Sequence, residues 1–458
     1  MPHIKKKAAL SNRKRLALVL LCLVYLVFAL IYSFMTPAWE ANDEADHTIY
    51  AERIIEHHKL PRIGLQNGHE SHQPPLYYVV LAGWQRVLHI PSFQPELITA
   101  PNAAILGPST EPKLGLSHQY NHRQKQQAIY LHELRVLSVL CGLGTVIFTF
   151  LTAQLIFGKL RFSVSATLFV VLLPKELVVS SVVTNDSLVI LLSSALIYLS
   201  VRLCSLSRAA SKRYLFLLGM VAGAAVLTKL NSFPLVMLIL VGVIIHQYVL
   251  FSKRFVPPIL YMFGFLFICG WWLVFNLIQY GDPLAQTVSN SYLAPAIPGL
   301  IVPVSLLDAH RYLHFLPSEL LRTAWYDGGW NQLIIPKWIN VSLWTAAGAS
   351  IFSAGIRLIR SFKLYDAKDR ACFITLVLGL AAGALALYII ARTTVQGEGR
   401  VGYVGLSAFA ILCTFGMNEA FTKLMPKLKY VGLLIWPLSL LLVDVYIFVH
   451  IILPLGSL

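Results

Sequence analysis

The chain alternates long apolar segments with shorter polar ones. Eleven apolar runs stand out, and most are long enough to cross the ~30 Å hydrocarbon layer of a bilayer as α-helices. The pattern predicts an all-α polytopic membrane protein, a bundle of about eleven transmembrane helices. These runs lie near Leu16–Met35, Leu134–Phe157, Val164–Val183, Leu188–Leu203, Tyr214–Leu227, Phe233–Leu250, Val256–Ile278, Ile339–Ile356, Cys372–Ile390, Val404–Met417 and Val431–Pro454.

Two long polar segments, residues 36–132 and 281–337, interrupt these runs, and the parity of the spans puts both on the face opposite to the N-terminus. Inside the first segment, residues 47–59 and 74–90 predict short helices that lie at the membrane surface. Residues 92–127 are rich in Pro, Gly, Gln and Asn, which predicts a lid or a substrate-contacting segment. Little sequence remains for a separate soluble domain, so we expect residues 1–458 to form one transmembrane unit.

Composition supports this class, because 57% of the residues are hydrophobic, only 13% are charged and the mean hydropathy is +0.67. The formal net charge of +16 would suit nucleic-acid binding, but most of the 37 Lys and Arg residues lie in the N-terminal segment and the loops on its side. The positive-inside rule accounts for this distribution without a nucleic-acid partner. It predicts a cytoplasmic N-terminus and places both long loops outside.

Two further features restrict the prediction. The first apolar run is long and no small-residue cleavage site follows it, so we expect an uncleaved first span rather than a signal peptide. The six cysteines lie in or beside spans or on the inner side, and none lies in an outer loop. The sequence therefore predicts neither a disulfide framework nor a thiolate metal site.

Acidic residues crowd the segment directly after the first span, where Glu40, Asp43, Glu44, Asp46 and His47 stand close together. One interpretation is a solvated turn that caps the following helix, since Asn and Asp before a helix accept backbone N–H bonds. The other is a catalytic site. A carboxylate that is partly desolvated at the membrane surface has the raised pKa that a general base for a sugar hydroxyl needs.

These residues and several later motifs, in the same order, resemble the GT-C superfamily of membrane glycosyltransferases. Asp43-Glu44 is similar to the acidic pair of that superfamily, and with His47 it resembles the D-E-x-x-H pattern of a bacterial branch. That branch is related to protein mannosyltransferases and aminoarabinose transferases. Further similar motifs are His72-Gln73-Pro74-Pro75-Leu76-Tyr77-Tyr78, Thr184-Asn185-Asp186-Ser187, Trp271-Trp272 with Asn276, Tyr280-Gly281-Asp282-Pro283 and Glu398-Gly399-Arg400. The chain departs from the pattern at Gln73, Phe275 and Glu398, where relatives have Lys, Arg and Gln.

The resemblance implies a GT-C-like bundle with interfacial helices in the first outer loop. It also implies an inverting transferase that moves a sugar from a polyprenyl-phosphate carrier to an acceptor hydroxyl outside the cytoplasm. Asp43, Glu44 and Asp186 would be catalytic, with Asp43 as the base, and His47, His72 and Gln73 would bind substrate. The acceptor would be a lipid, a protein or a cell-wall glycan, and the setting a bacterial plasma membrane. No cofactor is required. Some relatives use a divalent ion beside the acidic pair, but the histidine spacing is not diagnostic and a metal stays unassigned.

Other charged and aromatic residues have two interpretations each. Arg392 and Arg400, in the outer loop before the tenth span, would hold the donor phosphate or meet lipid headgroups. Lys229 would bind substrate or extend its ammonium to the membrane surface. Asp186 would act in catalysis or cap the fourth span. Trp325 and Asp327 have the composition of a sugar-stacking site, although aromatic residues also anchor proteins at the interface.

Two other functions stay open. A transporter or flippase of lipid-linked glycan would also place polar groups inside a helical bundle, with its functional charges near mid-span. Here most charged candidates lie at outer ends of spans; Asp444 and Lys175-Glu176 are the exceptions. The departures at Phe275 and Gln73 also allow an inactive scaffold that keeps the fold.

Overall fold

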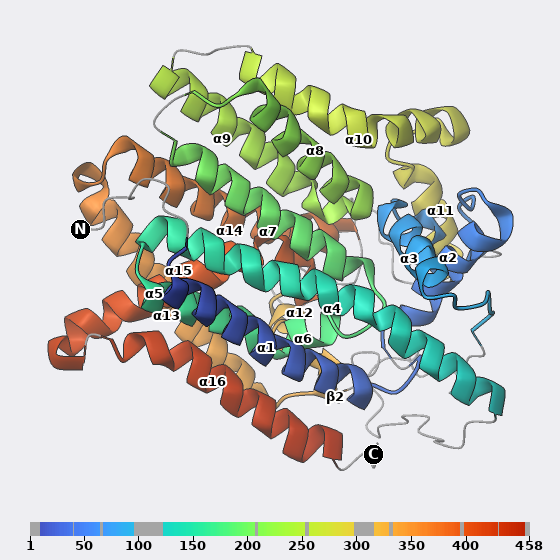
Figure 1. The fold of residues 1–458 in the computed structure, drawn as a ribbon, viewed down its shortest axis with the longest axis horizontal. Helices are drawn as coiled ribbons and strands as arrows, with labels where there is room; N and C mark the ends of the chain where they lie inside the picture. Colours follow the sequence, from blue (N-terminus) through green and yellow to red (C-terminus); the bar gives the residue numbers. More distant parts are fainter. Residues whose placement is uncertain are drawn as a thin grey trace.

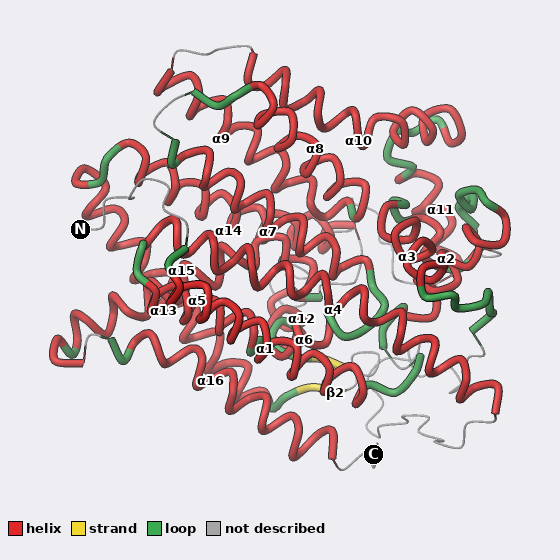
Figure 2. The backbone as a smooth tube through the Cα atoms, viewed as in Figure 1, coloured by secondary structure: helices red, strands yellow, loops and turns green. Residues whose placement is uncertain are grey.

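The computed structural model describes residues 10–39, 41–64, 67–95, 122–206, 209–251, 256–296, 316–328, 333–393, 398–428 and 430–453. α-Helices dominate these ranges, and the long ones lie side by side in a tilted bundle (Figure 1). Figure 2 shows that the loops connecting them gather at the ends of the bundle. The architecture confirms the prediction of an all-α polytopic membrane protein.

Nine helices in the described ranges are long and apolar enough to cross a membrane. Each of them coincides with a run that the sequence predicts to span, which confirms nine of the eleven predicted positions. Most of their exposed side chains are apolar, as expected for surfaces that face lipid. The nine are, or contain, α1 (Asn12–Met35), α4 (His122–Phe157), α7 (Asn185–Cys204), α9 (Phe233–Phe251), α10 (Val256–Tyr280), α13 (Lys337–Ser361), α14 (Ala367–Thr393), α15 (Leu406–Leu424) and α16 (Gly432–Ile447).

The third and fifth predicted spans are shorter than expected. The third is divided into α5 (Leu160–Val171) and α6 (Pro174–Val179). Pro174 cannot continue a helix, and Leu173 before it is extended, with φ −82° and ψ 109°. The fifth is α8 (Lys212–Thr228), which has 17 residues and ends where Lys229 becomes extended. In the described residues, length and composition thus single out nine of the eleven predicted runs, and the third and fifth are a broken helix and a short one.

Glycines allow the closest approaches between helices. A methyl group at Gly219 of α8 would clash with the carbonyl oxygen of Tyr261 in α10, and one at Gly264 of α10 would clash with that of Phe216. Gly416 of α15 faces the carbonyl oxygen of Ser350 in α13 in the same way. Small residues at crossing points are typical of membrane bundles, where tight backbone packing replaces the hydrophobic effect as the driving force.

The first loop contains the two short helices that the sequence predicts, α2 (Glu44–His57) and α3 (Leu76–Val87), with the 3₁₀ turn η2 (His69–His72) between them. Figure 1 shows α2 and α3 together at one end of the bundle. Tyr77 and Tyr78 of α3 are fully buried in a core shared with α2 and α4. Most of the predicted lid segment, residues 92–127, lies outside the described residues.

The second loop forms α11 (Gln286–Ala296), α12 (Leu316–Thr323) and a small antiparallel pair, β1 (Asp327–Gly328) with β2 (Leu333–Ile334). The residues before β1 fold inward rather than outward. Trp325 and Tyr326 are buried, and the backbone N–H of Lys175 in α6 donates to the carbonyl of Trp325 over 3.0 Å. This connection fixes part of the second loop inside the bundle.

Candidate active site

Charged side chains from four distant segments meet at one end of the bundle. Asp43 lies directly before α2, Asp186 lies in the first turn of α7, and Lys229 follows the last residue of α8. Arg400 belongs to η7 (Gly399–Gly405), the 3₁₀ segment that leads into α15, and Glu398 precedes it. We call these five residues the charged cluster. Four of them are residues that the sequence predicts to act in catalysis or binding.

Arg400 is at the centre of the charged cluster. Its Nη2 donates to Oδ2 of Asp43 over 3.3 Å, and its Nη1 lies 3.5 Å from Oδ2 of Asp186. Its Nε contacts the carboxylate of Glu398. One guanidinium therefore joins three carboxylates from three different parts of the chain, and uses its planar fork to face two of them at once.

Asp186 differs from Asp43 in its surroundings. Its side chain is 1% exposed and accepts a 2.7 Å bond from Nζ of Lys229. The cap of α7 is Thr184, whose hydroxyl oxygen accepts from the backbone N–H of Asp186. Thr184, and not Asp186, therefore caps α7. With two cations beside it, Asp186 is well placed to fix the positions of Lys229 and Arg400.

Asp43 is the more accessible of the two carboxylates, with 25% of its side chain exposed. Its backbone is left-handed, with φ 61°, a conformation that few residues other than glycine adopt without a structural reason. Burial raises the pKa of Asp43 above its ordinary value, and the Arg400 guanidinium opposes this shift. A raised pKa at an accessible carboxylate is what a general base near neutral pH requires.

Glu44, the neighbour of Asp43 in the acidic pair, points away from the cluster. It is fully buried and forms two bonds with Arg135 of α4, from Nε over 2.8 Å and from Nη2 over 2.7 Å. The backbone N–H of Val183 donates to the same carboxylate over 2.9 Å. With these partners Glu44 is a structural anchor in the described state, and removing one side of such a buried pair costs about 3–5 kcal/mol of stability. Its predicted catalytic role has no support from this geometry.

His47 lies behind the cluster. Its Nδ1 is 2.9 Å from the Tyr78 hydroxyl and 3.9 Å from the carboxylate of Glu70, which is also buried. Burial lowers the pKa of His47 well below its ordinary value, with further lowering by Lys229 and Arg400. Burial raises the pKa of Glu70, and the nearby charge of Asp43 adds to that rise. His47 is therefore a neutral ring that supports this wall of the site.

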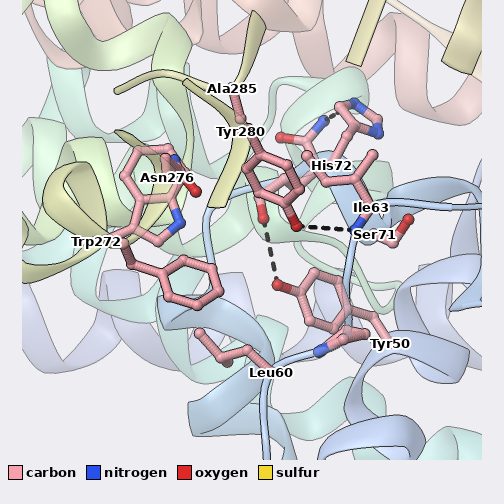
Figure 3. A pocket seen from close by; sticks show the side chains of 12 residues that line it. Tyr50, Leu60, Ile63, Ser71, His72, Trp272, Asn276, Tyr280 and Ala285 are labelled. Atoms are coloured by element: carbon pink, nitrogen blue, oxygen red, sulfur yellow. Dashed lines mark hydrogen bonds between the residues drawn. The ribbon is translucent and has the colours of Figure 1, made fainter. Parts of the chain in front are cut away.

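A small pocket, partly open to solvent, lies between the first loop and α10 (Figure 3). Aromatic side chains from both sides line it, including Tyr50, Trp272 and Tyr280. The Tyr280 hydroxyl accepts from the backbone N–H of Ile63 over 3.2 Å, as Figure 3 shows, and this bond joins α10 to the first loop. The Tyr50 hydroxyl donates to the carbonyl of Gln73 over 3.4 Å, which joins two parts of the first loop.

His72 and Gln73 connect the pocket with the charged cluster. The Gln73 amide Nε2 lies 3.0 Å from Nε2 of His72, and its oxygen accepts from Asn185, the residue before Asp186, over 3.4 Å. Burial lowers the pKa of His72 to about 4, so its ring is neutral at physiological pH. Both residues line the pocket, as their predicted binding roles require.

The remaining candidates lie elsewhere. Trp325 is buried and stacks on Trp436, with ring centroids 5.7 Å apart. Asp327 is buried against Lys175. Neither offers exposed surface to a sugar, so their predicted binding roles have no support here. The side chain of Arg392 and all of Glu40 lie outside the described residues.

Sequence reasoning missed Arg135 and Glu70, and it named Asn185 only as part of the Thr184-Asn185-Asp186-Ser187 motif. Arg135 stands in an apolar span, and an intramembrane arginine is itself a signal for a functional or paired site. Glu70 had no comparable local signal. Across the described part of the chain, no group of three or more His, Cys, Asp or Glu side chains is arranged to hold a metal ion. The cation that joins the carboxylates of the cluster here is the guanidinium of Arg400.

Comparisons with known proteins bear on the fold. A family model described as dolichyl-phosphate-mannose-protein mannosyltransferase matches residues 131–274, less than half of the chain. Among solved structures, ArnT from Cupriavidus metallidurans bound to undecaprenyl phosphate is similar with a TM-score of 0.53 and 14% identity, over 96% of this chain and 73% of that one. Comparison with curated proteins gives no significant match.

A second similar structure is the Archaeoglobus fulgidus oligosaccharyltransferase tethered with an acceptor peptide. Its TM-score is 0.50 at 11% identity, over 98% of this chain and 55% of that one, so the chain spans about half the length of that enzyme. The chain shares its fold with these two solved structures, in agreement with the fold that the sequence motifs imply.

Proposed function

We propose that the protein is an inverting glycosyltransferase that takes a sugar from a polyprenyl-phosphate carrier and transfers it to an acceptor hydroxyl on the extracytoplasmic face. The observation that carries the proposal is the contact of Arg400 with both Asp43 and Asp186 at the end of the bundle. It brings an accessible carboxylate with a raised pKa next to cations that suit a phosphate.

The chemistry follows from these positions. The acceptor oxygen attacks the anomeric carbon while the bond from that carbon to the phosphate oxygen breaks. Asp43 takes the proton of the acceptor hydroxyl as the new bond forms. Negative charge grows on the departing polyprenyl phosphate, and Arg400 and Lys229 stabilise it. Asp186 holds both cations in place through its contacts with them.

The pocket beside His72 and Gln73 supports a place for the sugar. The half-buried rings of Phe275 and Tyr280 are available to stack on the apolar face of a sugar ring, and the amide of Gln73 offers hydrogen bonds to its hydroxyls. None of the described lining residues is Asp, Glu, Lys or Arg. The phosphate would therefore lie in the charged cluster, and the sugar beside it in the uncharged pocket.

The test is product formation by purified Asp43→Asn protein with a panel of polyprenyl-phosphate sugars. Asn keeps the shape of the side chain but removes its basicity, so turnover is expected to fall by about 10²-fold or more. Glu56→Gln is the matched control, because Glu56 lies on α2, the helix that follows Asp43, and its carboxylate pairs with Arg53 at the surface. That variant should keep wild-type turnover.

A normal size-exclusion profile and thermal unfolding temperature would show that Asp43→Asn is folded. Near-normal turnover in that folded sample would remove Asp43 as the base and transfer the assignment to Asp186. Normal product formation by the Asp43→Asn/Asp186→Asn double variant would exclude this mechanism. Absence of any transfer by the wild-type protein, together with movement of lipid-linked glycan across vesicles, would favour the transporter.

A further inference from the structure

Arg135 ties the segment that carries Asp43 to α4. It is fully buried in α4, and besides its two bonds to Glu44 it donates to three backbone carbonyls at the end of α1 and just beyond it. Nη1 bonds to Ser33 and Thr36, each over 2.7 Å, and Nη2 bonds to Pro37 over 3.1 Å. A single side chain therefore fixes both ends of residues 33–44.

The path of the backbone between those ends needs such a restraint. Trp39 and Asp43 both have left-handed backbones, with φ 68° and 61°, and neither is a glycine. Residues in this conformation persist when surrounding contacts hold them. Because Glu44 is the next residue after Asp43, the position of its carboxylate sets the start of α2 and the direction in which Asp43 points.

The Arg135–Glu44 pair also contacts the segment that carries Asp186. Glu44 accepts the backbone N–H of Val183 over 2.9 Å, three residues before Asp186. Asp43 and Asp186 must lie at a fixed separation if Arg400 is to contact both, which it does over 3.3 and 3.5 Å. Arg135 and Glu44 form the buried connection between the two segments behind that contact.

We propose that Arg135 is a positioning residue of the transferase, which acts through Glu44 to hold Asp43 in its catalytic position beside Asp186 and Arg400. This inference rests on the proposed function of Asp43 as the base. Arg135 does not touch substrate in this role, because its side chain has no exposed surface and all three of its nitrogens bond to protein acceptors.

The first experiment removes the connection without leaving a buried charge unpaired. The double variant Arg135→Met/Glu44→Gln loses both charges and keeps an acceptor for the N–H of Val183. We expect kcat to fall at least tenfold while KM for the lipid-linked donor stays within twofold, because Arg400, Lys229 and all of the pocket lining except Tyr50 lie outside α2. Arg135→Lys, which keeps the charge, should recover part of that loss.

The matched control is Tyr32→Phe. It removes another buried hydrogen bond of α1, the 2.7 Å bond to Asp444, but does not touch residues 33–44. Its kcat should stay within about twofold of wild type. A loss equal to that of the Arg135→Met/Glu44→Gln variant would mean that any weakening of α1 lowers turnover, and would overturn the specific role of Arg135.

A cycle with Asp43→Asn separates positioning from general damage. If Arg135 acts through Asp43, adding Arg135→Met/Glu44→Gln to the Asp43→Asn variant should change the turnover of that variant little. If the losses of turnover instead multiply, the Arg135–Glu44 pair and Asp43 act independently, which would refute the proposal.

A measurement without turnover separates this proposal from the proposed function. In Asp43→Cys protein, the rate of labelling by a water-soluble thiol reagent should rise several-fold when Arg135→Met/Glu44→Gln is added, because the segment is no longer held. Protein with the native Asp43 gives the background from the six native cysteines. An unchanged rate would overturn the positioning role even if Asp43 proves to be the base. A raised rate with normal turnover in Asp43→Asn would leave the restraint standing and refute the function of Asp43.

Discussion

Replacing Arg400 by Lys tests whether the fork of its guanidinium, rather than its charge alone, organises the site. In the structure two different amino groups face two different carboxylates, Nη2 toward Asp43 over 3.3 Å and Nη1 toward Asp186 over 3.5 Å. A Lys ammonium is a single point charge and cannot take both positions at once. Arg400→Lys therefore keeps the net charge of the cluster but loses one of the two contacts.

The size of the effect follows from these distances. At an effective dielectric constant near 20, two unit charges at such a separation attract by about 5 kcal/mol, but most of that is offset by the loss of hydration. The net contribution of one hydrogen bond between charged groups is about 1.5–3 kcal/mol. Loss of one contact should thus lower kcat/KM for the lipid-linked donor by about 10- to 150-fold.

The assay is initial-rate transfer by purified protein in nanodiscs, at donor concentrations above and below KM. Arg357→Lys is the matched control, since Arg357 pairs with Glu419 over 3.4 Å and its side chain is 40% exposed, so the change should be neutral. If Arg400→Lys keeps the wild-type kcat/KM, the fork is not needed and the interpretation of Arg400 as a residue that meets lipid headgroups gains weight.

Two further predictions concern pH and topology. Burial raises the pKa of Asp43 above its ordinary value of 3.8, and the base must be deprotonated to act. We therefore expect kcat/KM to fall as the pH is lowered through that raised pKa. A pH–rate profile should show this acidic limb in wild type and lack it in Asp43→Asn. An acidic limb that persists unchanged in Asp43→Asn would contradict the assignment. For topology, single cysteines at Gly115 and at the exposed position Lys363 should react with membrane-impermeant reagents only from outside and only from inside, respectively. The reverse at either position would contradict an inner N-terminus.

The helices were predictable because their signal is local. An apolar run of about twenty residues can satisfy its backbone in a membrane only as a helix, so length and composition suffice. The break at Pro174 is also a local property, but the run through Val164–Val183 hid it, because hydropathy does not register a missing N–H. The early end of α8 at Lys229 has a different cause. That residue turns away to pair with Asp186 of α7, a contact that no local pattern contains.

The site was predictable only in part, and the acidic pair shows why. Asp43 and Glu44 are adjacent, and both are carboxylates at the start of a predicted helix. Their roles differ because Glu44 meets Arg135, which lies 91 residues away in the sequence, whereas Asp43 meets Arg400, which lies 357 residues away. Such long-range pairs depend on the fold, and the sequence alone does not distinguish the two carboxylates.

The two arginines also explain how one acidic pair can serve both stability and chemistry. Arg135 is fully buried and forms paired bonds to Glu44, so that carboxylate has no open face for a reactant. Arg400 is shared among Asp43, Asp186 and Glu398, and Asp43 keeps a quarter of its side chain exposed. A carboxylate that shares its cation and keeps an open face can exchange a proton with an acceptor, while its neighbour, fully bonded, fixes where that exchange takes place. We therefore expect a substitution at Glu44 that leaves Arg135 unpaired to destabilise the protein. A substitution at Asp43 should leave the stability of the protein near that of wild type and lower its turnover.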